Sequence, residues 1–280
     1  MNETSLSTAI EAALVARNLR NMQHARRALT PGYYLRAARM LRDVSGVVII
    51  GTGFPVSGTF ETDGPVGAIA LYEALEKLGA EPWLACDRPL SSCLQSDYRL
   101  LELHARSPGA AETEAAANLA RLQPDAVISI ERPGLSADGR YYNMRGEDIT
   151  PHSACFDAYI TGARCPTIAI GDGGNEIGMG NIRAAIADLD INAAETGCDV
   201  LLVADVSNWG AYGLIALLGL WRQRDLLAEI SPLAILEYLS GHGSVDGVTR
   251  ANTLTEDGLD AAEGQKVIDE LRALTGFVSS

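Results

Sequence analysis

Short runs of apolar and β-branched residues recur along the chain, between segments whose apolar residues follow a helical period. The runs occupy positions 47–50, 83–86, 126–130, 167–170 and 200–204. Residues 65–78, between the first two runs, have apolar side chains three or four positions apart, which is the helical pattern. Uninterrupted apolar runs are typical of parallel strands buried on both faces. The pattern therefore predicts an α/β fold: a doubly wound, mainly parallel sheet with helices on both faces, of the Rossmann-like kind.

Both ends of the chain have helical patterns. Within residues 1–45, Thr30 followed by Pro31 predicts the start of a helix that ends near Asp43. Residues 231–280 predict two further helices on either side of a glycine-rich turn at 241–244. The sequence contains no internal repeat and no low-complexity linker. We therefore expect a single α/β domain over residues 1–280, with a helical N-terminal segment, 1–45, packed on it.

Acidic residues follow the predicted strands. Four of the five runs end within a residue of a carboxylate, and the first leads into a loop that holds two: the residues are Asp87, Glu131, Asp172 and Asp205, with Glu61 and Asp63 in the loop. Ligands of open parallel sheets bind at this edge, and acids gathered there would repel one another without a cation. Such oxygen ligands suit Mg²⁺ or Mn²⁺. Alternatively the acids cap the helices that follow. Helix capping is the favoured interpretation for Asp87 and Asp205. For Asp63, helix capping and ligand binding are equally favoured.

The segment 171–181, Gly-Asp-Gly-Gly-Asn-Glu-Ile-Gly-Met-Gly-Asn, is the densest motif. Its glycines allow a sharp turn and a close approach of the backbone to a ligand. The N–H groups around Gly173 and Gly174 can form an anion-binding nest. Asp172, Asn175 and Glu176 add side-chain oxygens at the same place. A plain turn is the alternative, but this combination favours a binding site.

Three other loops carry candidate binding groups. In the loop 51–65, Thr52, Gly53 and Thr62 could hold a carboxylate or phosphate near a helix start. Its glycine spacing is not that of a dinucleotide site, so NAD is not expected. Arg132, and Asn143 with Arg145 in the loop 138–146, could clamp an acidic substrate, although each arginine could equally pair with a surface acid. Asn208, after the last run, suits either a helix cap or a ligand.

Composition narrows the classes of partner. The net charge of −14 makes nucleic acid and anionic membrane surfaces poor partners and leaves small metabolites and metal cations. The only lysines are Lys77 and Lys266, and both lie in helical segments. Because pyridoxal phosphate is held by a lysine Schiff base, its chemistry is not expected. The five cysteines lack the paired spacing of a disulfide framework or a zinc site. The longest apolar stretch (211–221) is too short to span a bilayer. The N-terminal residues lack the pattern of a secretory signal. We expect a cytoplasmic protein.

Four segments together resemble the D-glutamate cyclase-like C-terminal domain family. They are GTGFPVSGTFETDGP, ERPG with DGRYYNMRG, GDGGNEIGMGN, and DVSNWGAYG, and the resemblance runs from about Thr30 to at least Gly258. The family reaction that it implies is the dehydration of D-glutamate to 5-oxo-D-proline, a hydro-lyase reaction. In the mammalian enzyme this domain follows a hydro-lyase-like domain. A separate subunit of that kind is therefore one protein partner to consider. The other candidate partners are a second copy of the chain and a small acidic metabolite.

For that reaction we predict a divalent metal, Mn²⁺ or Mg²⁺, on Asp63, Asp172 and Glu176, with Glu131 and Asp172 as catalytic residues. Glu131 would move the proton. Substrate binding is assigned to Thr52, Gly53, Thr62, Arg132, Asn143, Arg145, Gly173, Gly174, Asn175 and Asn208. The competing interpretation is a domain that binds a nucleotide or a small phosphometabolite, with the glycine-rich loops on the phosphate and the acids on its magnesium.

Overall fold

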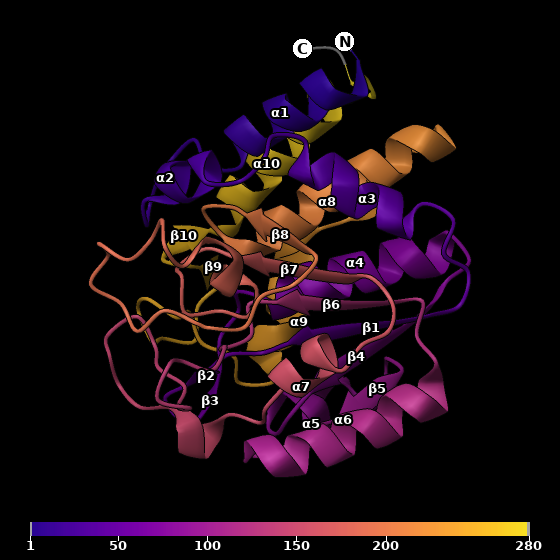
Figure 1. Ribbon diagram of the computed structural model, residues 1–280. Coiled ribbons are helices and arrows are strands. Elements are labelled where there is room, and N and C mark those ends of the chain that lie inside the picture. The colour runs from indigo at the N-terminus through magenta and orange to yellow at the C-terminus, as the bar shows by residue number, and fades with distance from the viewer. Residues whose placement is uncertain (1, 279–280) are drawn as a thin grey trace.

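The computed structural model describes residues 2–278, which build one six-stranded sheet with helices on both sides (Figure 1). The strands are β1 (Val47–Thr52), β4 (Glu81–Cys86), β5 (Leu100–Glu102), β6 (Ala126–Ile130), β7 (Thr167–Gly171) and β8 (Val200–Val203). Every neighbouring pair is parallel. The predicted parallel α/β fold is thus confirmed, and β5 is the strand that the sequence pattern missed.

The strand order is β5-β4-β1-β6-β7-β8. Numbered along the chain within the sheet, this is 3-2-1-4-5-6, the order of doubly wound nucleotide-binding folds. The chain begins in the middle, builds one half outward, and returns to build the other half from β6. The loops that leave β1 and β6 therefore diverge, and a crevice opens between them at the carboxyl ends of the strands.

Two layers of helices cover the sheet. On one face lie α3 (Tyr33–Leu41), α4 (Pro65–Lys77) and α8 (Ser207–Arg222); on the other lie α5 (Leu90–Leu94), α6 (Pro108–Leu122) and α7 (Asp157–Thr161), as Figure 1 shows. Over the first layer pack α1 (Glu3–Ala13), α9 (Pro232–Gly241) and α10 (Ala261–Leu274). None of the helices in residues 2–278 has the length and apolar character needed to cross a membrane.

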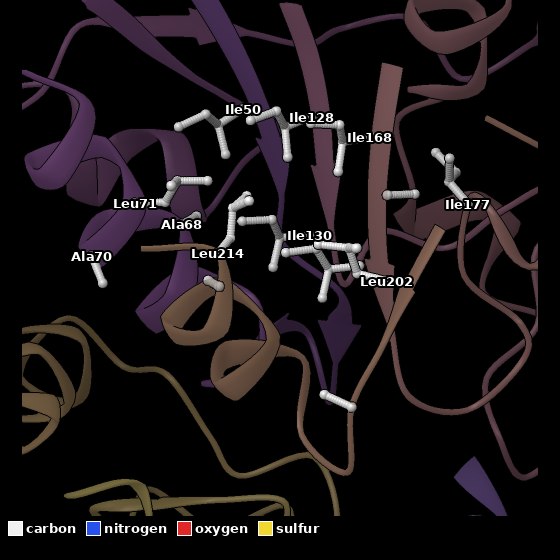
Figure 2. Close-up of a cluster of buried hydrophobic side chains, with 14 of the residues drawn as sticks. Ile50, Ala68, Ala70, Leu71, Ile128, Ile130, Ile168, Ile177, Leu202 and Leu214 are labelled. Carbon is white, nitrogen blue, oxygen red and sulfur yellow. The ribbon is translucent and has the colours of Figure 1, made fainter. Parts of the chain in front are cut away.

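The core lies between the central strands and the helices α4 and α8. Ile50, Ile128 and Ile168 project from three neighbouring strands toward Leu71 and Leu214 of those helices (Figure 2). Each of these side chains is fully buried, and burial of one contributes about 1.5–3 kcal/mol. These contacts fix α8 against the sheet and so fix the position of its N-terminus at the crevice.

The N-terminal segment is helical, as expected, but its helices begin and end differently. α2 spans Met22–Arg27, and α3 starts at Tyr33, after Gly32, rather than at Pro31. Two side chains of α1 cap it: Glu11 accepts from the Gly32 N–H at 2.8 Å and Ser7 from the Leu35 N–H at 3.0 Å. Because the cap comes from another helix, the local Thr-Pro signal did not set the start.

Two short hairpins complete the loops at the crevice. β2 (Pro55–Val56) pairs with β3 (Thr59–Phe60) in the loop after β1, and β9 (Thr255–Glu256) pairs with β10 (Leu259–Asp260) just before α10. Single 3₁₀ turns occur at Thr150–His152, Met179–Ile182 and Leu227–Glu229. The hairpin β9–β10 separates the two C-terminal helices that the sequence placed directly on either side of the turn at 241–244.

Candidate active site

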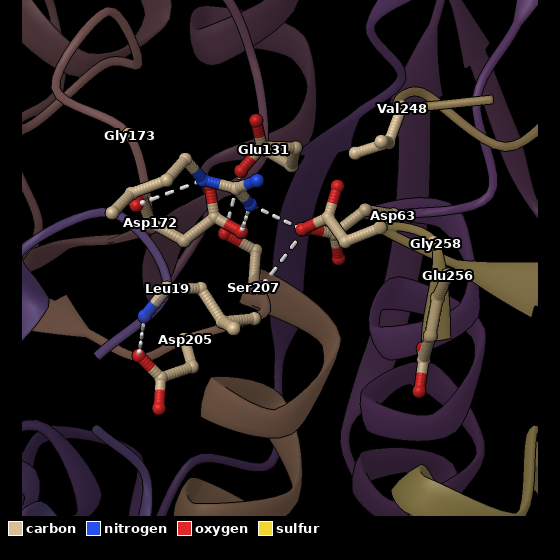
Figure 3. A network of polar contacts seen from close by, with 12 residues as sticks. Leu19, Asp63, Glu131, Asp172, Gly173, Asp205, Ser207, Val248, Glu256 and Gly258 are labelled. Carbon is tan, nitrogen blue, oxygen red and sulfur yellow. Dashed lines mark hydrogen bonds and ion pairs between the residues drawn. The ribbon is translucent and has the colours of Figure 1, made fainter. Parts of the chain in front are cut away.

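Three carboxylates from three different loops converge at the crevice. Asp63 comes from the loop after β1, Glu131 directly follows β6, and Asp172 directly follows β7. One oxygen from each lies within 4.8 Å of the others, and all three side chains are buried. Figure 3 shows the three groups around one point, with Ser207 beside them. The parallel sheet brings them together because its strands end at the same edge.

The N-terminus of α8 holds Asp63. The Oδ1 atom accepts from the N–H groups of Asn208 and Gly64, both at 2.9 Å, and Oδ2 accepts from the Ser207 N–H at 3.0 Å. Asp63 therefore caps α8 and not α4, the helix that follows it in sequence. The helix N-terminus favours the charged carboxylate. Each oxygen has more than one lone pair, so the cap leaves room for a cation.

Glu131 adopts an unusual backbone conformation. Its φ of +46° lies in the left-handed region, which few non-glycine residues adopt because it costs conformational energy. The Ser207 hydroxyl donates to its Oε2 at 2.6 Å. The turn and this hydrogen bond aim the carboxylate of Glu131 into the cluster and away from the core beneath β6.

A guanidinium group enters the same cluster from the N-terminal segment. Arg20, between α1 and α2, donates from Nη2 to the carboxylates of Asp172 and Asp257, and from Nε to the Asp172 carbonyl at 3.3 Å. Asp257 lies at the turn of the β9–β10 hairpin with a φ of +52°. The sequence analysis assigned no role to either residue. The Asp-Gly pair at 257–258 signals a hairpin turn, but nothing in the sequence directs Arg20 to the site.

Burial and mutual repulsion perturb these acids. Burial and the charge of Asp257 raise the pKa of Asp63 to about 8. Burial, together with the charge of Asp172, raises the pKa of Glu131 well above its usual range. Burial does the same for the pKa of Asp172, although Arg20 opposes the shift. One guanidinium does not balance these carboxylates, so a further cation would be stabilised here. An all-oxygen set of this kind suits Mg²⁺ or Mn²⁺.

A cavity of about 550 Å³ opens over the acids. Its walls near the cluster include Arg20, Glu61, Glu131, Asp172 and Asp257. Glu61 is 8% exposed, and its carboxylate makes no hydrogen bond or ion pair with any residue in the range 2–278. Burial raises the pKa of Glu61 well above its usual range. The cavity is in the size range of small-molecule sites, and it offers one unpartnered buried acid.

Three of the predicted substrate-binding residues line this cavity: Asn143, Arg145 and Asn175. Asn175 donates from Nδ2 to the Tyr142 carbonyl at 2.8 Å, while its buried Oδ1 has no partner. Arg145 donates to the Val248 carbonyl at 2.9 Å and pairs with no carboxylate among the described residues. Asn143 is largely engaged in its own turn, where its Oδ1 accepts the Arg145 N–H at 3.0 Å. Asn175 and Arg145 thus keep free groups for a ligand.

Arg132 lies elsewhere. Its Nη1 donates to Asp87 Oδ1 at 2.8 Å and to the carbonyls of Thr52 and Gly53 at 3.2 and 3.0 Å, and its Nη2 donates to the Ala154 carbonyl. Its side chain is 1% exposed. The guanidinium ties together the ends of β1, β4 and β6 beneath the cavity. We therefore correct its assignment: in this structure Arg132 is not among the groups that a substrate in the cavity could contact.

The glycine-rich loop places its two acids differently. The Glu176 carboxylate turns back onto its own loop, where Oε1 accepts from the Gly173 N–H at 2.8 Å and Oε2 from the Gly174 N–H at 2.7 Å. It therefore does not join Asp63 and Asp172 in the carboxylate group that could hold a metal. The two N–H groups that were predicted to bind an anion bind this internal carboxylate.

The remaining predicted residues brace the loops. Asn208 accepts from the N–H groups of Gly64 and Gly67 at 2.9 and 2.7 Å and donates to Glu256 at 2.7 Å. Thr62 donates its hydroxyl to the Thr255 carbonyl at 2.8 Å. The buried hydroxyl of Thr52 has no partner among the described residues. Thr52, Gly53, Thr62 and Asn208 do not line the cavity.

Asp87 and Asp205 each anchor a distant loop instead of capping the helix that follows. Asp205 accepts from the N–H groups of Arg17, Asn18 and Leu19 at 2.7, 3.1 and 3.1 Å, and Figure 3 shows the contact with Leu19. Asp87 accepts from Arg132 and from the Ala154 N–H at 3.0 Å. The contacts of Asp205 therefore hold in place the segment that carries Arg20 to the carboxylates.

The chain is similar to known proteins. A family model described as D-glutamate cyclase-like, C-terminal, matches residues 10–272. Mitochondrial D-glutamate cyclase of Homo sapiens is 33% identical over 194 residues, which cover 60% of this chain and 32% of that protein, so the chain spans about a third of its relative's length. An exopolyphosphatase-related protein from Bacteroides fragilis superposes with a TM-score of 0.42 at 11% identity over 90% of this chain and 62% of that one. Because the family model spans nearly the whole sequence, the chain belongs to the D-glutamate cyclase-like, C-terminal family.

Proposed function

We propose that this chain is a metal-assisted lyase that closes D-glutamate to 5-oxo-D-proline with release of water. The observation that carries the proposal is the meeting of the carboxylates of Asp63, Glu131 and Asp172, of which Glu131 and Asp172 line the cavity. Membership of the family and the similarity to a human protein named D-glutamate cyclase support it. The reaction joins the α-amine nitrogen to the γ-carboxyl carbon, and one γ-oxygen leaves as water.

Asp63, Glu131 and Asp172 would hold the divalent cation. Their three buried carboxylates are a hard-oxygen donor set with excess negative charge, which fits Mn²⁺ or Mg²⁺. When bound, the cation would supply Lewis-acid polarisation of the γ-carboxylate. The sequence analysis placed Glu176 in this set; the loop contacts of Glu176 lead us to propose Glu131 in its place.

Glu61 is the group that we assign to proton transfer. Burial raises the pKa of Glu61 and so favours its protonated form, which can deliver a proton to the departing oxygen. It lies in the cavity wall and has no competing partner among residues 2–278. Glu131, to which the sequence analysis gave this role, is instead hydrogen-bonded to Ser207.

Asn175 and Arg145 would orient the substrate. Arg145 faces the cavity and can bind the α-carboxylate with its fork of N–H donors. The unpartnered Oδ1 of Asn175 can accept from the substrate amine. An amine held among the acids would be attracted as an ammonium group, and it must lose a proton before it attacks the γ-carbon.

Product analysis tests the proposal. The protein is incubated with D- or L-glutamate, in EDTA or with added Mn²⁺, and 5-oxoproline is separated by chiral chromatography. We expect 5-oxo-D-proline from D-glutamate with metal. Asp172→Asn should lower turnover at least about 100-fold while the circular dichroism spectrum stays native. Asp43→Asn is the matched control, because the Asp43 side chain is 85% exposed. Absence of 5-oxoproline under every condition, or full activity of Asp172→Asn, would refute the proposal.

A further inference from the structure

The cavity is larger than free glutamate requires. Glutamate has about ten non-hydrogen atoms. If each atom took up as much space as a water molecule in the liquid, roughly 30 Å³, glutamate would fill about 300 Å³. That figure is generous, since bonded atoms lie closer together than water molecules. The cavity measures about 550 Å³. Space for a second chemical group therefore remains beside a glutamyl group.

Charge divides the cavity into two halves. The buried and half-buried lining residues, which form its floor, include four carboxylates and one guanidinium: Glu61, Glu131, Asp172 and Asp257, with Arg20. The exposed lining residues, which form its mouth, include four guanidiniums and two carboxylates: Arg88, Arg106, Arg145 and Arg250, with Glu147 and Asp148. The floor is thus negative and the mouth positive in a chain with a net charge of −14. Such a division favours a ligand with a cationic end inside and an anionic end at the mouth.

Arg88, Arg106 and His152 are exposed basic residues of the mouth that come from neighbouring parts of the fold, and we call them the basic cluster. Arg88 follows β4 and Arg106 follows β5, and Nη1 of Arg106 donates to the carbonyl of Pro151, the neighbour of His152, at 3.1 Å. All three side chains line the cavity. The cluster lies at the ends of the strands β4 and β5, on the other side of β1 from β6 and β7, whose ends supply Glu131 and Asp172.

The guanidinium charges of this cluster are only partly balanced. Asp87, which lies 3.8 Å from Nη2 of Arg106, is already paired at 2.8 Å with the buried Arg132. Arg88 pairs through Nε alone with Glu102 at 3.1 Å, and its side chain is 71% exposed. Exposed pairs of this kind are weak, so both arginines can turn their remaining N–H groups to a ligand.

We propose that Arg88, Arg106 and His152 form an anion subsite, which binds the carboxylate or phosphate of a γ-glutamyl compound beyond its γ-carbonyl. The glutamyl part of this proposal rests on the proposed function. In such a substrate the α-amine nitrogen bonds to the γ-carbonyl carbon, and the bond from that carbon to the leaving nitrogen or oxygen breaks. The leaving group takes the proton that the amine loses. No redox partner is required.

Two matched substrates test the subsite. γ-D-Glutamylglycine and γ-D-glutamylglycinamide differ in one terminal carboxylate, and the L compounds are measured in parallel. We expect kcat/KM with Mn²⁺ to be at least about tenfold higher for the glycine compound, and the advantage to shrink with added salt. The double variant Arg88→Gln/Arg106→Gln should remove the advantage. Arg224→Gln, whose arginine is exposed and pairs with Glu229 outside the cavity, should retain it.

The outcomes separate this proposal from the proposed function. Equal kcat/KM for the two compounds, or an advantage that survives in the double variant, would overturn the subsite. Turnover of D-glutamate without turnover of γ-D-glutamylglycine or γ-D-glutamylglycinamide would overturn the substrate class. The cyclase proposal would then still stand. If no glutamyl compound reacts, inorganic phosphate is the probe: a rise of Tm in the wild type that the double variant lacks supports the subsite, and no rise overturns it.

Discussion

Replacing Arg132 by methionine should lower the free energy of unfolding. It should have little direct effect on substrate binding. Methionine fills most of the same space, so the change removes the donors without leaving a large cavity. The guanidinium serves Asp87 and the carbonyls of Thr52, Gly53 and Ala154. Asp87 would keep only the Ala154 N–H and the more distant Arg106.

The contacts set the size of the effect. Removal of one partner from a buried ion pair costs about 3–5 kcal/mol, mostly because the other charge stays buried. The Nε atom of Arg132 is already buried without a partner, and losing it offsets part of that cost. We therefore expect the free energy of unfolding to fall by about 3 kcal/mol. For a chain of this size the melting temperature should fall by roughly 6 °C or more.

Urea unfolding followed by tryptophan fluorescence measures this change, and a double-mutant cycle with Asp87→Asn isolates the ion pair. The double variant should be less destabilised than the sum of the two single variants, because the uncompensated charge is gone. Arg183→Met is the control, since Arg183 forms an exposed pair with Glu195. A loss below about 1 kcal/mol combined with a tenfold or larger rise in KM for glutamate would refute this reasoning and return Arg132 to the substrate site.

Three further predictions concern the acids. Asp205→Ala should lower the free energy of unfolding by about 2–3 kcal/mol and reduce turnover through displacement of Arg20; native stability in urea would contradict it. Glu176→Gln should lower the free energy of unfolding by about 1–3 kcal/mol, because the glutamine amide nitrogen would face an N–H group. A variant as stable as the wild type would exclude the loop contacts of Glu176 as a source of stability. In EDTA, stability should fall as the pH rises from about 5 to 8, because Asp63, with a pKa raised to about 8, binds its proton more tightly in the folded state than in the unfolded one. Thermal unfolding at the two pH values checks this, and stability that increases over the range would refute it.

The central sheet was predictable because its strands are buried on both faces. The runs at 126–130 and 167–170 contain almost only apolar residues, and the structure buries every one of their positions. β5 escaped prediction because it is three residues long and half-buried at the sheet edge, so it has no continuous apolar run. The start of α3 was displaced because its cap comes from α1, and local sequence does not record a contact between helices.

The acids of the site were predictable in part for a topological reason. Parallel strands end at one edge, so Asp172 and Glu131 had to lie near each other. Which acid of the glycine-rich loop turns inward could not be predicted, because Glu176 is held by hydrogen bonds to N–H groups of its own loop. Arg20 lies 152 residues from its partner Asp172, and no periodicity or motif connects positions so far apart.

The anchoring of residues 17–19 by Asp205 has a consequence for engineering the protein. A protease nick or an inserted peptide between residues 17 and 20 would leave every strand of the sheet intact, yet it would release the charge that Arg20 brings to its two acids. Affinity tags and reporter fusions at the N-terminus should therefore keep that short stretch unaltered. The same stretch offers a place where a cleavable peptide could turn this protein into a protease-controlled switch.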